Sequence, residues 1–168
     1  MKYLAIGVIA SALFLASCLP KEDPVEYNDS IVSRIDGVIQ AINGLESTFE
    51  SYVPGEMDSA YQVLMLSLQE STQGVDSIGL LGNDSLLKKA AEATLLRHTS
   101  VARDLYPEYI SLLKVPDSLF TPELQTRAFE VKEQIDRQNA EAQQLFTNAQ
   151  TAFGKEYSVS FEDQAAEE

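Results

Sequence analysis

The sequence contains a single cysteine, a single histidine and no tryptophan, and basic side chains are scarce. One Cys excludes an internal disulfide and any zinc site built from several thiolates. One His excludes metal and haem sites that need two imidazoles. There are 12 Lys and Arg against 26 Asp and Glu, which gives a net charge of −14. This acidity argues against nucleic acid as a partner, because phosphate binding needs clustered cations.

The N-terminal region of the sequence is apolar. Met1-Lys2 supplies a positive start, residues 3–14 are mostly apolar, and Leu15-Ala16-Ser17-Cys18 follows. The run is shorter than the roughly 20 residues of a membrane-spanning helix and has the form of a secretory signal. Its end matches the bacterial lipobox, whose Cys is diacylated before cleavage. We therefore expect a lipoprotein signal peptide at 1–17 and a lipid, such as palmitate, on Cys18. The alternative is an ordinary signal peptide with an incidental Cys.

Residues 18–26 combine the lipidated Cys with two prolines and several charges, which is typical of a tether. Lys21-Glu22-Asp23 resembles the Lys-acid-acid signal that sends Bacteroidota lipoproteins to the outer cell surface. The alternative is a solvated linker without a signal. The expected location is the outer membrane, with the protein anchored by its lipid and exposed at the surface.

The remaining chain is predicted to be helical. Apolar residues recur at alternating steps of four and three in four segments, separated by residues 53–56, 81–85 and 115–120. Pro107 interrupts the third segment and predicts a kink or a split there. Thr121-Pro122-Glu123 has the cap, proline and acid expected where the fourth helix starts. The sequence thus predicts an all-α fold, an up-down-up-down antiparallel four-helix bundle over 27–154, followed by an acidic tail at 155–168.

Several short runs resemble a known family. These are Tyr27-Asn28-Asp29, residues 82–86, Glu108-Tyr109 and residues 146–153. They are similar to an uncharacterised family of helical surface lipoproteins from spirochaetes and Bacteroidota. The resemblance implies a surface lipoprotein of unknown activity, and it carries over no catalytic residue.

The sequence offers no set of catalytic or metal-binding residues. A di-iron bundle needs Glu-x-x-His pairs, but Leu95 stands three residues before His98, the only histidine. Asn83-Asp84 lacks the twelve-residue pattern of a calcium loop. We therefore expect no enzymatic activity, no metal and no cofactor.

Four polar residues occupy positions in the helical seams. Summing the register across antiparallel pairs places Ser71 near Thr94 and His98 near Gln138, in one layer at mid-height. One interpretation is a pocket, which would make the protein a binder of small molecules or metal. The other is a hydrogen-bonded layer that fixes helix register, which we favour because it needs no ligand.

Apolar residues also collect at the end of the predicted bundle opposite the tether. Tyr52, Leu119 and Phe120 would meet there and form a partner site, or Leu119 and Phe120 would fold inward and close the core. The function favoured by the sequence is a non-enzymatic binding or structural role at the cell surface.

Overall fold

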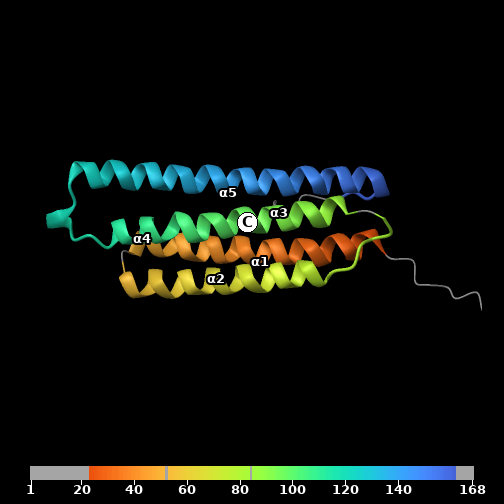
Figure 1. The fold of residues 1–168 in the computed structure, drawn as a ribbon, viewed down its shortest axis with the longest axis horizontal. Helices are drawn as coiled ribbons and strands as arrows, with labels where there is room; N and C mark the ends of the chain where they lie inside the picture. Colours follow the sequence, from red (N-terminus) through yellow and green to blue (C-terminus); the bar gives the residue numbers. More distant parts are fainter. Residues whose placement is uncertain (1–22, 52, 84, 162–168) are drawn as a thin grey trace, which may run out of the picture.

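The computed structural model describes residues 23–51, 53–83 and 85–161, and none of these belongs to a β-strand. The prediction of an all-helical fold is confirmed. Figure 1 shows the helices side by side along one long axis. The elements in chain order are α1 (Pro24–Ser51), α2 (Pro54–Ser77), α3 (Leu86–Asp104), α4 (Tyr106–Leu113), the short 3₁₀ helix η1 (Asp117–Leu119) and α5 (Pro122–Tyr157). Four residues of the predicted sites, Cys18, Lys21, Glu22 and Tyr52, lie outside the described residues.

The longest helix, α5, has 36 residues and sets the length of the rod. At 1.5 Å per residue it is about 54 Å long. No helix among residues 23–51, 53–83 and 85–161 is both long enough and apolar enough to cross a bilayer.

The first helix begins earlier than the sequence pattern suggested. Residues 24–26, assigned to the tether, form the first turn of α1. The Asp23 carboxylate accepts a 2.8 Å hydrogen bond from the backbone N–H of Val25. Pro24 favours this start, because a proline at the first helical position has the required φ and lacks only an N–H that the helix would not use.

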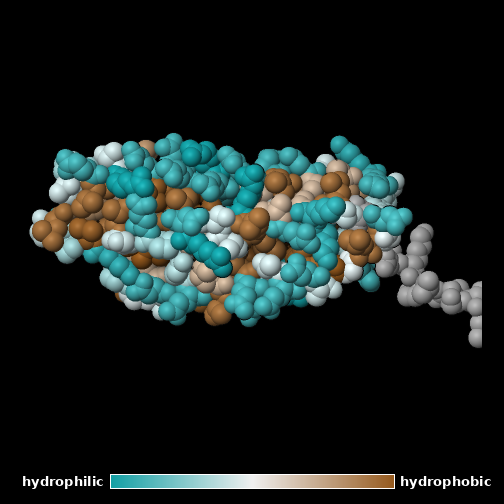
Figure 2. Space-filling model, in the orientation of Figure 1, coloured by the Kyte–Doolittle hydropathy of each residue, from teal (hydrophilic) through white to brown (hydrophobic). Residues whose placement is uncertain are grey.

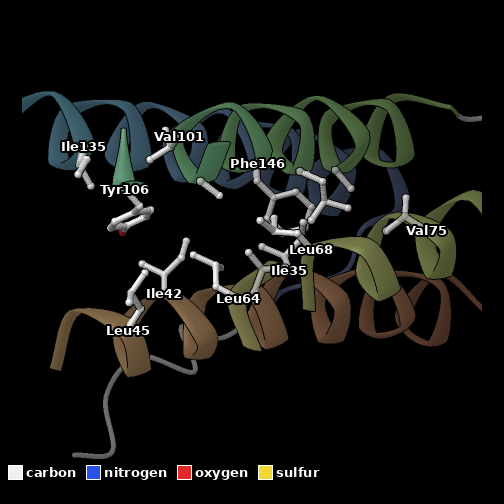
Figure 3. Packing of buried hydrophobic residues seen from close by; sticks show 14 of the residues in the cluster. Ile35, Ile42, Leu45, Leu64, Leu68, Val75, Val101, Tyr106, Ile135 and Phe146 are labelled. Atoms are coloured by element: carbon white, nitrogen blue, oxygen red, sulfur yellow. The ribbon is translucent and has the colours of Figure 1, made fainter. Parts of the chain in front are cut away.

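The predicted break at Pro107 is confirmed. Helix α3 ends at Asp104 and α4 begins at Tyr106. Proline cannot donate the backbone hydrogen bond that would continue the helix, and its ring clashes with the preceding turn. The break turns Tyr106 into the core, where it is 0% exposed. Figure 3 shows its ring directed toward the side chains of α1.

The core is built from two different repeats. Helix α1 buries a strict heptad seam made of Ile31, Ile35, Val38, Ile42, Leu45 and Phe49. Helix α5 instead buries Val131, Ala142 and Phe153, with Ile135 and Phe146 offset by one turn, so that equivalent positions recur every eleven residues. An eleven-residue repeat corresponds to 3.67 residues per turn, close to a straight helix, whereas a heptad frame drifts by about 20° per heptad. Steps of four and three continued along this segment predict core positions at Leu145 and Ala152, each one residue before the buried Phe146 and Phe153.

The two ends of the rod differ in how they are closed. The end defined by Asp23, residues 78–83 and residues 157–161 is here called the tether end, and the end defined by Val53 and residues 113–121 is the far end (Figure 1). At the tether end the Phe153 ring lies 5.7 Å from Tyr27, 4.6 Å from Tyr157 and 6.1 Å from Phe161.

This aromatic cluster changes the predicted tail. Helix α5 extends to Tyr157, and residues 158–161 fold back on it through a 2.8 Å hydrogen bond from Val159 N–H to the Gly154 carbonyl. The compact turn depends on the missing side chain of Gly154, where a Cβ would stand 2.8 Å from the Val159 carbonyl oxygen. Residues 155–161 are therefore part of the fold, and 162–168 lie outside the described residues.

Candidate functional site

Three of the four polar seam residues are buried. Ser71 lies on α2, and Thr94 and His98 lie one turn apart on α3. The Thr94 hydroxyl donates a 3.2 Å hydrogen bond to the carbonyl oxygen of Ala142 on α5. His98 Nδ1 lies 2.9 Å from Oδ1 of Asn139, also on α5. Thr94 and His98 therefore connect α3 to α5 at two successive turns.

The partner of His98 differs from the prediction. The amide that reaches it belongs to Asn139 rather than to Gln138, which is half-buried. The cause is the eleven-residue repeat of α5, which rotates the core-facing position by one residue relative to a heptad frame. Ser71 forms no hydrogen bond with Thr94, His98 or Gln138 within the three described stretches.

The hydrogen bonds continue beyond Asn139 through the core. Asn139 Nδ2 donates to the Tyr106 hydroxyl at 3.3 Å, and that hydroxyl donates to Glu46 Oε1 on α1 at 2.7 Å. We call His98, Asn139, Tyr106 and Glu46 the polar chain. It joins α3, α5, α4 and α1, so one connected set of hydrogen bonds links four helices.

The outer end of the polar chain is held by two charges on α5. Lys132 Nζ lies 3.6 Å from Glu46 Oε2 and also donates to Asp136. Burial lowers the pKa of Lys132, but its hydrogen bond to Asp136 and the charge of Glu46 more than offset this, so the pKa is raised. Lys132 therefore stays protonated, and its positive charge balances Glu46 at the rim of the core.

The order of donors and acceptors fixes the state of each member. The Glu46 carboxylate accepts, so the Tyr106 hydroxyl must donate to it and can only accept from Asn139. The Asn139 amide nitrogen is then used on Tyr106, which leaves its oxygen facing His98. That oxygen accepts only if Nδ1 of His98 carries the proton. The neutral imidazole thus has its lone pair on Nε2.

Burial keeps both titratable rings in their neutral forms. Burial, together with the neighbouring Glu46 carboxylate, raises the pKa of the Tyr106 phenol well above its usual range. Burial also lowers the pKa of His98, and the hydrogen bond to Asn139 offsets only part of this effect. At neutral pH the core of the polar chain is uncharged, with Glu46 as its charged terminus.

The far end has a different character. Leu119 is 64% exposed, Val53 is exposed, and Val115 and Phe120 are half-buried. None of residues 113–130 is fully buried, and Figure 2 shows apolar residues gathered at this end of the rod. Leu119 does not fold inward, so the capping interpretation is wrong for this residue.

Ion pairs fix the elements around the exposed far end. Lys114 Nζ lies 2.5 Å from Asp58 Oδ1, which connects the end of α4 to α2. Arg127 binds Glu108 through two hydrogen bonds of 2.6 and 2.9 Å, which connect α5 to α4. Leu119 is thus presented from a short loop whose two flanking helices are both tied to the bundle.

Three members of the polar chain had no sequence signal strong enough to find them. Asn139 follows the residue that the heptad frame assigned to the core, and Glu46 follows the seam residue Leu45. Tyr106 directly precedes Pro107, and this adjacency was the available clue, because a helix break re-aims the side chains next to it.

Within residues 23–51, 53–83 and 85–161, no three His, Cys, Asp or Glu side chains lie close enough together to hold a metal ion. Comparison of the chain with models of protein families, with curated proteins and with solved structures found no match.

Proposed function

We propose that the protein is a lipid-anchored rod at the bacterial outer surface that presents its far end to a macromolecular partner and has no enzymatic role. The observation that carries the proposal is the apolar surface of the far end, where Figure 2 shows apolar residues gathered and where Leu119 of η1 is 64% exposed. Apolar residues that gather on one exposed surface, rather than lying singly, are typical of a site that binds a protein partner.

The anchor is inferred from the sequence. Cys18 ends a lipobox, and Lys21-Glu22-Asp23 supplies the surface signal. Two or three acyl chains would hold the protein stably on a membrane, because a single chain gives only marginal binding. A rigid helix of about 54 Å would then carry Leu119 well away from the bilayer.

The rod is proposed to be an up-down-up-down bundle. Two cross-helix pairs support this arrangement: Asn28 accepts a 3.1 Å hydrogen bond from Gln150, and Glu46 pairs with Lys132. Residue numbers rise along α1 as they fall along α5, which is the relationship of antiparallel neighbours. In this proposal the polar seam layer is structural, because Thr94 and His98 bond α5 directly.

The anchor is tested by Cys18→Ser, with Ser17→Ala as the matched control that keeps the cysteine. Cells are labelled with a fatty acid and fractionated, and intact cells are treated with protease. We expect the fatty-acid label and membrane association to be lost only in Cys18→Ser. We expect protease to reach the protein of natural sequence from outside the cell. Labelling of Cys18→Ser, or full protection of the protein of natural sequence from protease, would contradict the proposal.

The partner site is tested by photo-cross-linking in cells. A photoreactive amino acid is placed at Leu119 and, as the control, at Leu96, which is 68% exposed on α3. We expect a cross-linked species of discrete mass from position 119 only. Equal yields from both positions, or none from 119, would show that the far end is not the partner site.

A further inference from the structure

His98 is the only histidine of the chain and is 1% exposed. Its Nδ1 is used on Asn139, whereas its Nε2 is buried and has no hydrogen-bond partner among the described residues. A neutral ring leaves only a bare lone pair there. A protonated ring would place a charge and an additional N–H donor in the same enclosed position, and a buried charge without a partner is far more costly.

The groups around His98 do not compensate such a charge. From α5 it meets the neutral amide of Asn139, and Lys132 and Asp136 lie at the outer end of the polar chain. Tyr106 of α4 and Glu46 of α1 are reached only through that amide. The buried residues of α2 are Met57, Leu64, Leu68, Ser71 and Val75, none of which is acidic or basic. No carboxylate is therefore bonded to the imidazole among the described residues.

We propose that His98 is an acid-sensitive latch, in which uptake of a solvent proton at Nε2 breaks the polar chain and loosens α4 from α1 and α5. The proton adds to the Nε2 lone pair while Nδ1 keeps its own, so the ring becomes an imidazolium. Hydration stabilises this ion when the ring turns toward water, and the turn separates the ring from Asn139. Asn139 is then free to leave Tyr106, whose bond to Glu46 connects α4 to α1.

The sign of the pH dependence follows from burial. Burial lowers the pKa of His98 in the folded chain below the value of about 6.5 for an unfolded chain. The unfolded state therefore binds the proton more readily. The contribution of the neutral His98 ring to the free energy of unfolding is therefore fully present above a pH of about 6.5. Below that pH the unfolding constant rises by at most about tenfold per pH unit. Asp36 has the opposite effect, because partial desolvation of this exposed side chain raises its pKa.

This inference goes beyond the proposed function and does not depend on it. The sole histidine makes the experiment clean, because its ring nitrogens give unambiguous ¹⁵N signals in the full chain. Urea unfolding is followed at pH 7.5, 6.5 and 5.5 in the unmodified chain and in His98→Asn. Asparagine keeps an N–H donor near the position of Nδ1 but does not titrate, and both chains retain Asp36. Hydrogen exchange of α4 is compared between the two chains at each pH.

We expect the Nδ1–H tautomer at pH 7.5. Relative to His98→Asn, the unmodified chain should lose up to about tenfold in its folding constant per pH unit below 6.5, and α4 should exchange faster at pH 5.5. An Nε2–H tautomer, or parallel pH profiles, would overturn the proposal. If His98→Asn does not fold, the tautomer and the pH dependence of folding in the natural chain test the proposal. A ring that titrates at about 6.5 without any change at Tyr106 would also overturn it.

Discussion

The Tyr106 hydroxyl donates a 2.7 Å hydrogen bond to Glu46, a residue 60 positions away on a helix that is not its neighbour in sequence. The tyrosine is 0% exposed, whereas the carboxylate is reached by solvent and pairs with Lys132. This bond joins the short helix α4, which a proline separates from α3, to the first helix of the bundle. A partly buried hydrogen bond to a charged acceptor is among the stronger kinds, worth about 1.5–3 kcal/mol.

Removing the Tyr106 hydroxyl should destabilise the protein measurably. We expect Tyr106→Phe to lower the free energy of unfolding by about 1–3 kcal/mol, because Glu46 and Asn139 each lose one hydrogen bond. In a Glu46→Ala background the same change should cost less, since one of the two bonds is already absent. Urea unfolding of the four chains gives the coupling energy.

A second tyrosine supplies the control for that cycle. Tyr61 is only half-buried, and its hydroxyl donates to the backbone carbonyl of Ala102 at 3.1 Å. In Tyr61→Phe, water can take the place of the lost hydroxyl at the Ala102 carbonyl, so this change should cost less than Tyr106→Phe. Additive effects of Tyr106→Phe and Glu46→Ala would show that the two side chains do not interact in solution.

Two helical glycines should respond in opposite directions to alanine. At Gly44 an added Cβ meets nothing within 4 Å, so Gly44→Ala should stabilise by about 0.5–1 kcal/mol through helix propensity. At Gly154 the Cβ would stand 2.8 Å from the Val159 carbonyl and 3.1 Å from the Phe161 ring, so Gly154→Ala should destabilise. Thermal melts of both variants decide this. A gain in stability at Gly154 would mean that residues 158–161 do not pack there in solution.

How much of this architecture the sequence could predict depends on the kind of signal. The heptad of α1 and the break at Pro107 were readable because periodicity and a missing N–H act locally. The partner of His98 was not, because a shift from 3.5 to 3.67 residues per turn moves the core-facing position by one residue over the length of α5. The sequence also did not decide whether the Leu119 side chain is buried or exposed, because a connecting loop of the same composition can cover a bundle end or extend from it.

The C-terminal cap of α5 offers an opportunity for stabilisation. Ser158 has a φ of 57° and a ψ of 37°, in the left-handed region that glycine adopts without strain. We expect Ser158→Gly to raise the free energy of unfolding by about 1 kcal/mol, because the strain of a side chain in that conformation costs about 1–2 kcal/mol and part of it is offset by the entropy of glycine. Gly82 has a φ of 58°, so Gly82→Ala should lose stability, and the two variants can be compared in the same urea titration.

The exposure of Leu119 predicts a separation between stability and binding at the far end. Leu119→Ser should change the free energy of unfolding by less than about 0.5 kcal/mol, because a side chain that is 64% exposed contributes little to the core. Met57 begins the buried face of α2 and is 0% exposed, so Met57→Ala should cost about 2–5 kcal/mol. Differential scanning calorimetry of the two variants measures both effects. If Leu119→Ser lowers the melting temperature as much as Met57→Ala does, Leu119 closes the core in solution, and the partner site must be sought elsewhere on the rod.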